Sequence, residues 1–270
     1  MVENVSKRRL NMKKYILLGF LILSILPAVS IQANELTADE IVARANDASY
    51  YAGKDGSATA TMALSDGRTR EFVILRKNAE DNKEQKFYVY FNGPADVRKM
   101  AYLVWKKPGG DDDRWLFLPA LNLVKRIAPG DKRTSFVGSD FYYEDVSGRS
   151  LDADVHELVE TTDTQYVVKN TPKDAGSVEF AHYIVWIDKE TFIPRKAEYT
   201  DRNGTLYRRV SADDMQTIQG YPTSMKQRAE DLVTGSHTEI TFTKILYDIG
   251  LQDQIFTERF LRRPPREATR

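Results

Sequence analysis

Acidic and hydroxyl side chains near the middle of the chain have types and spacings that could support catalysis. Asp140 and Glu144 are four residues apart, which would place two carboxylates on one helical face, where they could act as general acid and base. Ser139 precedes them without an evident base, and the chain has neither a Gly-x-Ser-x-Gly elbow nor a phosphate-binding loop. Nothing near the carboxylates predicts a substrate pocket, so we expect no catalysis and no catalytic residues.

Metal-ligand patterns are also weak. The three histidines, His156, His182 and His237, lie in separate predicted strands and form no HxH or HExxH pair. The run PGGDDD at residues 108–113 could offer carboxylates to calcium, but a solvated loop between two strands explains it better. The sequence therefore predicts neither a metal site nor a cofactor.

Basic and acidic residues stand on either side of a short connection that contains Pro129-Gly130. One interpretation is a polar rim that recognises a head group or a partner, and the other is a set of ion pairs and turn caps that fix a loop over the sheet. In the second, Gly138 permits a tight turn and Asp140 caps a short helix that begins at Phe141. The charged residues concerned are Lys125, Arg126, Lys132, Arg133, Asp140, Glu144 and Asp145.

The elements that must position these side chains are mostly strands. Thr37 and Glu40 form a capping box that predicts one helix, with Ile41, Val42 and Ala45 as its apolar stripe. After it come strand-like segments, short connections and turn signals such as Asn203-Gly204, which predict one antiparallel sheet in one domain. The predicted strands are 57–64, 69–76, 84–91, 100–106, 114–118, 121–127, 155–160, 165–170, 180–187, 192–200, 205–210, 223–230 and 237–247.

Several central strands are apolar on both faces. The runs are FYVYF (87–91), MAYLVW (100–105), WLFL (115–118) and HYIVWI (182–187). A strand with one face in water alternates apolar and polar residues, so both faces of these strands must be covered. Either a cavity for an apolar ligand lies against one face, or an ordinary protein core fills both faces.

The N-terminus has the pattern of an export signal. Lys13 and Lys14 precede an apolar run of about twelve residues and then small residues up to Ala33, and such a run is shorter than the roughly twenty that span a bilayer. We expect residues 1–33 to be a cleaved signal peptide and residues 34–270 to be a single periplasmic domain. Cleavage removes five of 39 basic and one of 39 acidic residues, and leaves 34 and 38, a net charge of −4. This charge argues against a nucleic-acid partner, and the chain contains no cysteine for lipid anchoring or disulfides.

Two central segments, RWLFLPALNLVKRI (114–127) and FVGSDFYYEDV (136–146), resemble the signature of the LolA-like family of outer-membrane lipoprotein-sorting proteins. The hairpin IDKETFIPRKAEYTDRNG is also similar to that family, and with the first helix the resemblance covers most of residues 34–270. The resemblance includes Trp115, Leu116, Leu118, Pro119, Ala120, Arg126, Ile127, Gly138, Ser139, Asp140, Phe141, Tyr143, Glu144 and Asp145.

The resemblance implies a mainly β, α+β fold: a curved antiparallel sheet that forms a half-open barrel, closed by an N-terminal helix and short lid helices around an interior that shields acyl chains. No acyl-contacting residue is carried over from the family. From the apolar strands we expect the ligand-binding residues to be Phe87, Val89, Phe91, Leu103, Trp105, Trp115, Phe117, Tyr183 and Trp186. The motif and lid residues are Pro119, Arg126, Gly138, Ser139, Asp140, Phe141, Tyr143, Glu144 and Asp145.

These observations predict a monomeric periplasmic protein that carries lipoproteins or other acylated or hydrophobic cargo toward the outer membrane. Its partners would be lipoprotein acyl chains or lipid, an inner-membrane transporter and an outer-membrane acceptor. Two alternatives stay open. One is a sensor or accessory subunit of an inner-membrane transporter that uses the same cavity, and the other is an enzyme that modifies envelope lipid.

Overall fold

The computed structural model describes residues 35–79, 84–107 and 109–269, so the predicted signal peptide, residues 1–33, lies outside the described residues. All described helices and strands belong to one compact unit, Leu36–Arg270. Its first helix, α1 (Ala38–Tyr50), begins where the capping box predicts: the Thr37 hydroxyl accepts a hydrogen bond from the Glu40 N–H at 3.3 Å, and the Glu40 carboxylate accepts one from the Thr37 N–H at 2.8 Å.

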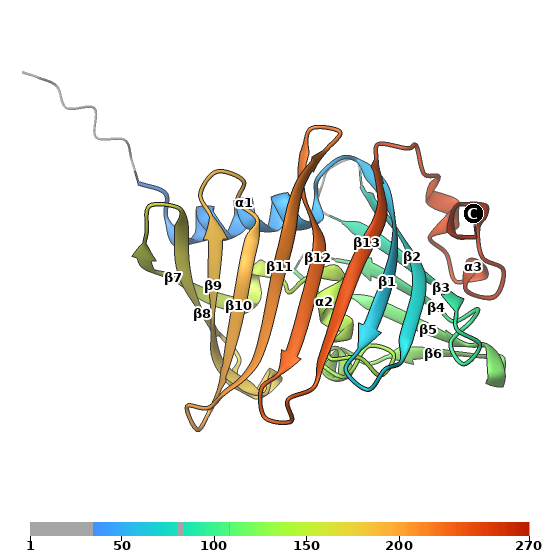
Figure 1. Cartoon of the computed structure of the whole chain (residues 1–270), viewed down its shortest axis with the longest axis horizontal. Coiled ribbons are helices and arrows are strands. Elements are labelled where there is room, and N and C mark those ends of the chain that lie inside the picture. The colour runs from blue at the N-terminus through green and yellow to red at the C-terminus, as the bar shows by residue number, and fades with distance from the viewer. Residues whose placement is uncertain (1–34, 80–83, 108, 270) are drawn as a thin grey trace, which may run out of the picture. The chain divides into compact units, whose positions relative to one another are not determined.

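Thirteen strands among the described residues form one antiparallel sheet (Figure 1). Its strand order is β6-β5-β4-β3-β2-β1-β13-β12-β11-β10-β9-β8-β7, so β6 and β7 are the two free edges of a curled sheet that does not close. The strands are β1 (Asp55–Leu64), β2 (Thr69–Asn78), β3 (Gln85–Gly93), β4 (Ala101–Lys106), β5 (Asp113–Leu118), β6 (Leu123–Ile127), β7 (Asp154–Thr161), β8 (Gln165–Pro172), β9 (Phe180–Asp188), β10 (Pro194–Asp201), β11 (Leu206–Ile218), β12 (Tyr221–Asp231) and β13 (His237–Tyr247).

The strand order requires a long connection between the two free edges. Residues 128–153 join β6 to β7, and they include the short helix α2 (Tyr143–Ser147). We call residues 128–153 the crossing segment. Figure 1 shows α1 and α2 on the same side of the sheet, behind the strands in that view. We call the face of the sheet on that side the inner face.

The remaining helical turns are short. They comprise α3 (Arg259–Arg262) and the 3-10 turns η1 (Pro119–Leu121), η2 (Pro129–Asp131), η3 (Leu151–Ala153), η4 (Ala175–Ser177), η5 (Asp253–Ile255) and η6 (Arg266–Ala268).

Successive residues of β3 contribute to two different cores. Phe87, Val89 and Phe91 pack on the inner face with aromatic residues of the crossing segment. Tyr88 and Tyr90, which alternate with them, pack on the outer face under the C-terminal segment, residues 248–269. That segment contributes Leu251, Ile255, Phe256, Leu261 and Ala268 to the outer core. Protein therefore covers both faces of the sheet at β3, β4 and β5.

The predicted curved antiparallel sheet with an N-terminal helix is confirmed, and the predicted strands agree with the observed ones to within a few residues at most ends. The Asn203-Gly204 turn also forms, with Gly204 at φ 84°. The largest difference is β11, which continues to Ile218, because its polar end pairs with the first residues of β12. The cover that the C-terminal segment provides was not predicted.

Candidate ligand-binding cavity

A cavity of about 430 Å³ lies on the inner face of the sheet, between α1, the crossing segment and the strands. Strands from both halves of the sheet line it, from β1, β2 and β3 on one side and from β8 to β13 on the other. This volume is within the range of pockets that hold one ligand of drug-like size. The cavity is therefore large enough for part of a single apolar molecule.

Most of the cavity wall is apolar. From α1, Val42 and Ala45 face it, and Ala45 also packs with Val168 and Ile187 in the core under the helix. The sheet contributes further aliphatic and aromatic side chains because the residues that alternate on each strand point inward. They include Ile74, Phe87, Val89, Val185, Ile187, Val210, Ile240 and Phe242.

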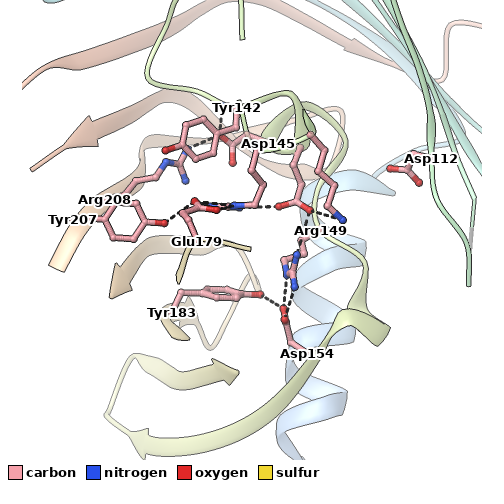
Figure 2. Close-up of polar contacts among 12 residues, drawn as sticks. Asp112, Tyr142, Asp145, Arg149, Asp154, Glu179, Tyr183, Tyr207 and Arg208 are labelled. Carbon is pink, nitrogen blue, oxygen red and sulfur yellow. Dashed lines mark hydrogen bonds and ion pairs between the residues drawn. The ribbon is translucent and has the colours of Figure 1, made fainter. Parts of the chain in front are cut away.

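A network of charged residues lies where the crossing segment meets the cavity. Arg149 forms two hydrogen bonds with the Asp154 carboxylate, both of 2.8 Å, and the Tyr183 hydroxyl donates to the same carboxylate at 2.9 Å (Figure 2). Arg149 and Tyr183 also line the cavity. Burial, and then the nearby Asp154 carboxylate, raises the pKa of Tyr183, so this hydroxyl is neutral and donates a hydrogen bond at neutral pH.

Glu144 is the centre of the same network. Its carboxylate accepts a 2.8 Å hydrogen bond from Arg133 and lies 3.4 Å from an Arg149 nitrogen and 3.6 Å from the Lys132 ammonium. Burial raises the pKa of Glu144, but the guanidinium groups of Arg133 and Arg149 outweigh burial and hold this pKa below its usual value. Glu144 is therefore ionised and surrounded by cations.

Two further ion pairs connect the crossing segment to Glu179, which immediately precedes β9, and to Arg208 of β11. Arg133 also binds Glu179 at 2.8 Å, and the Tyr207 hydroxyl donates to Glu179 at 2.8 Å. Arg208 of β11 lies 2.5 Å from the Asp145 carboxylate, and its guanidinium is 4.1 Å from the centre of the Tyr142 ring (Figure 2). The charges of the crossing segment thus pair largely with each other and with the sheet, which supports the interpretation as ion pairs that fix a loop.

Arg76 occupies a different part of the cavity wall. Its guanidinium donates to the Asn78 side chain at 2.6 Å and to the Ala52 carbonyl, just after the end of α1. Burial lowers the pKa of Arg76, although nearby tyrosines and carboxylates partly oppose this effect. This arginine therefore connects β2 to the C-terminal end of α1 beside the apolar space.

The structure divides the nine predicted ligand-binding residues between the two faces. Phe87, Val89 and Tyr183 line the cavity. Phe91 is on the inner face but packs against Phe72 and Phe136, with ring centres 5.5 and 5.8 Å apart. The other five do not line the cavity. They are Leu103, Trp105, Trp115 and Phe117, which pack on the outer face against the C-terminal segment, and Trp186, which contacts the Lys196 ammonium at 3.6 Å.

The motif residues are distributed along β5, β6 and the crossing segment. Phe141 and Asp145 line the cavity, Tyr143 lies in the inner core, and Ser139 is buried with its hydroxyl donating to the Phe136 carbonyl at 2.7 Å. Gly138 adopts a φ of 77°, as expected for a tight turn. Pro119 starts η1 and does not line the cavity.

Three expectations for the charged motif residues are wrong. Asp140 does not cap a helix, because α2 begins at Tyr143, and its carboxylate instead accepts hydrogen bonds from Ser236 at 2.5 Å and Thr238 at 2.6 Å. Since Asp140 precedes α2, it also does not share a helical face with Glu144. Arg126 pairs with Asp113 on β5, and so does not face the acidic residues of the crossing segment.

Sequence reasoning missed most of the wall. Val42 and Ala45 of α1 were recognised only as an apolar stripe, and Val210, Ala212 and Phe242 belong to strands with mixed polar and apolar residues. Apolar residues at alternate positions of β11 and β13 indicate which side chains point inward, but this pattern does not reveal whether a cavity or a packed core lies inside.

Within the described part of the chain, no group of three or more His, Cys, Asp or Glu residues is arranged to hold a metal ion. Nor does that part contain a helix both long and apolar enough to cross a membrane.

Solved structures share this fold. A DUF1329 family protein from Desulfovibrio piger has a TM-score of 0.76 at 29% identity, and the alignment covers 83% of this chain and 97% of that one. A domain assigned as an outer membrane lipoprotein-sorting protein, from Vibrio parahaemolyticus, has a TM-score of 0.76 at 27% identity, with 84% and 98% covered. A LolA superfamily protein from Nitrosomonas europaea has a TM-score of 0.62 at 21% identity, with 84% and 100% covered.

Comparison at the level of sequence gives a family. No curated protein matches the chain significantly. A family model described as "Uncharacterized protein" matches residues 83–263, which is more than half of the chain. The chain therefore belongs to the family that this model describes, and its fold is that of the LolA-like lipoprotein-sorting proteins.

Proposed function

We propose that this protein binds the acyl chain of a lipid or lipoprotein in the inner-face cavity and carries it through the periplasm without catalysis. The observation that carries this proposal is the cavity of about 430 Å³ with a mainly apolar wall. The names of two structural relatives, a lipoprotein-sorting protein domain and a LolA superfamily protein, favour the same class of cargo. The export pattern of residues 1–33 supports the periplasm as the location.

The energetics favour an acyl chain as the ligand. Each buried CH₂ group contributes about 0.8 kcal/mol, so a chain of about sixteen carbons could gain about 12 kcal/mol as an upper limit. Side chains that must leave the cavity when the ligand enters reduce this gain, and release to an acceptor then becomes feasible. Of the nine residues predicted from the strand pattern, we retain Phe87, Val89 and Tyr183 as ligand contacts.

Blocking the cavity tests the proposal. Ala58 lines it from the central strand β1, and a tryptophan there would occupy part of the space. The next residue, Thr59, is not part of the cavity wall and points to the opposite face, so Thr59→Trp is a matched control. Binding of a fluorescent fatty acid should fall at least tenfold in Ala58→Trp and stay close to the unsubstituted value in Thr59→Trp.

Mass spectrometry of organic extracts would identify lipid that copurifies with the protein. We expect acylated molecules in extracts of the unsubstituted protein and of Thr59→Trp, and a clear loss in Ala58→Trp. Equal fatty-acid affinity in both variants would show that the cavity is not the binding site. Conversion of the bound lipid to a product would contradict carriage without catalysis.

A further inference from the structure

An exposed apolar tip lies at the end of the β5–β6 hairpin. The side chain of Leu121 is 69% exposed and that of Leu123 is 46% exposed, on either side of Asn122. Asn122 has a left-handed backbone conformation, with φ 46° and ψ 37°, and its N–H donates to the Pro119 carbonyl at 3.1 Å. The turn is therefore well defined, and it presents two leucines to water.

Cations from the C-terminal segment lie beside this tip. Arg262 of α3 donates to the Asn122 carbonyl at 3.1 Å and to the Asn122 side-chain oxygen at 3.0 Å, and its guanidinium is 5.3 Å from the centre of the Phe117 ring. Leu261, which precedes Arg262 in α3, is only 1% exposed and packs in the outer core, so α3 is anchored against the sheet. Arg259 and Arg263 are exposed on the same short stretch, where Glu258 is the adjacent acidic residue.

The turn before β4 adds two more cations at the same end of the sheet. Ala101 pairs with Phe117, so the turn that carries exposed Arg98 and Lys99 adjoins the end of β5. Among the described residues, no ion pair joins Arg98, Lys99, Arg259 or Arg262 to a carboxylate. These arginines and this lysine contrast with Arg133 and Arg208, which are buried and pair with the carboxylates of Glu144 and Asp145, respectively. We call Arg98, Lys99, Leu121, Leu123, Arg259 and Arg262 the basic corner.

We propose that the basic corner docks this protein on the surface of an anionic lipid bilayer. Two leucines on a rigid turn can enter the headgroup region, while surrounding arginines and lysine bind lipid phosphates. A nucleic acid would use the cations but leave the leucines in water. Residues 34–270 contain 34 basic and 38 acidic residues, a net charge of −4, so the attraction depends on the local segregation of the cations.

Vesicle cosedimentation tests docking without reference to cargo. Unsubstituted protein should bind vesicles that contain phosphatidylglycerol and phosphatidylcholine, bind vesicles of phosphatidylcholine alone much less, and dissociate in about 1 M salt, where the Debye length is about 3 Å. Arg98→Gln combined with Arg259→Gln should reduce partitioning to anionic vesicles about tenfold or more. Leu121→Gln combined with Leu123→Gln should also reduce it, while the remaining binding stays sensitive to salt.

Control variants remove exposed positive charges and an exposed apolar side chain elsewhere on the protein. Lys173→Gln combined with Lys244→Gln neutralises two exposed lysines away from the corner, and Val233→Gln removes an apolar side chain that is 71% exposed. All variants share the same N-terminal residues, so differences in vesicle partitioning between them measure the contribution of the basic corner. Partitioning that falls equally in the controls and in the corner variants would overturn the proposal, as would equal binding to both kinds of vesicle. Because fatty-acid binding is measured separately, failure of docking is distinguishable from failure of the proposed carrier function.

Discussion

At the scale of single residues, Gly148 shows how closely the crossing segment approaches α1. It has φ 75° and ψ 156°, a conformation that is essentially restricted to glycine, and an added Cβ would lie 2.6 Å from the Tyr50 ring. Tyr50 ends α1 and also lines the cavity. A side chain at position 148 would therefore displace Tyr50 and with it the C-terminal end of α1.

We expect Gly148→Ala to lower the free energy of unfolding by at least about 2 kcal/mol, from backbone strain and from the clash with Tyr50. Gly130→Ala is the control, because Gly130 lacks a positive φ in this structure and a Cβ there would meet nothing within 4 Å. Urea unfolding monitored by tryptophan fluorescence measures the free energy of unfolding of both variants. Equal stability of the two variants would contradict this account of Gly148.

Lys106 gives a residue-scale prediction about pH. Its ammonium donates to the Ser147 carbonyl at 2.7 Å and lies 5.2 Å from the centre of the Tyr50 ring. Burial lowers its pKa from 10.5 to about 8, with Arg114 acting in the same direction and the carboxylates of Asp112 and Glu144 opposing it. Between these two pH values the unfolded chain holds more protons at this site than the folded chain, so this lysine makes stability rise with pH.

The size of this contribution is up to about 3 kcal/mol across that interval. Lys106→Met removes the titration, so the free energy of unfolding of the unsubstituted protein, minus that of the variant, should increase as pH rises from about 8 to 10.5. Tyrosines that titrate at higher pH are common to both proteins and cancel in this difference. A difference that is constant with pH would show that Lys106 keeps its ordinary pKa.

At the scale of elements, the strands were largely predictable and their faces were not. Alternation and turn residues locate β10 and the Asn203-Gly204 turn, because both signals are local in the sequence. The sequence cannot distinguish the inner from the outer face of β4 and β5, so Leu103 and Trp115 were expected at the ligand although they lie in the outer core. The C-terminal cover was missed because Leu251, Phe256 and Leu261 follow no strand or helix periodicity.

The crossing segment is the element whose position depends most on electrostatics. Arg133 is 6% exposed and pairs with Glu144 and Glu179, each at 2.8 Å. Arg133→Met would leave the buried Glu144 with one fewer cation, and we expect a loss of about 3–5 kcal/mol in unfolding free energy. Lys132→Met removes the same charge from a longer, 3.6 Å contact and should cost about 1 kcal/mol or less.

Urea unfolding of the two methionine variants provides the comparison. A cost for Lys132→Met as large as that for Arg133→Met would mean that net charge, and not the buried pair, positions the segment.

At the scale of the whole molecule, the C-terminal segment completes the outer core. Phe256 is 0% exposed, and its carbonyl accepts a 2.7 Å hydrogen bond from the Trp105 indole. Phe256→Ala should lower the free energy of unfolding by about 3–5 kcal/mol, whereas Val233→Ala, at a side chain that is 71% exposed, should change it by less than about 0.5 kcal/mol. Thermal unfolding of both variants measures the difference. A Phe256→Ala protein as stable as Val233→Ala would mean that the segment is not needed to cover the sheet.

The free edges β6 and β7 are joined through the crossing segment. Ion pairs hold this segment at Arg133, which binds Glu179 next to β9, and at Asp145, which binds Arg208 of β11. Any uncurling of the strands would increase the distance between the two edges and stretch this connection. Its contour length therefore sets a limit on how wide the molecule can open, whatever enters it. If the ion pairs that anchor the crossing segment break, its peptide chain still limits the distance between β6 and β7. A large ligand could then enter the cavity while the sheet stays curved.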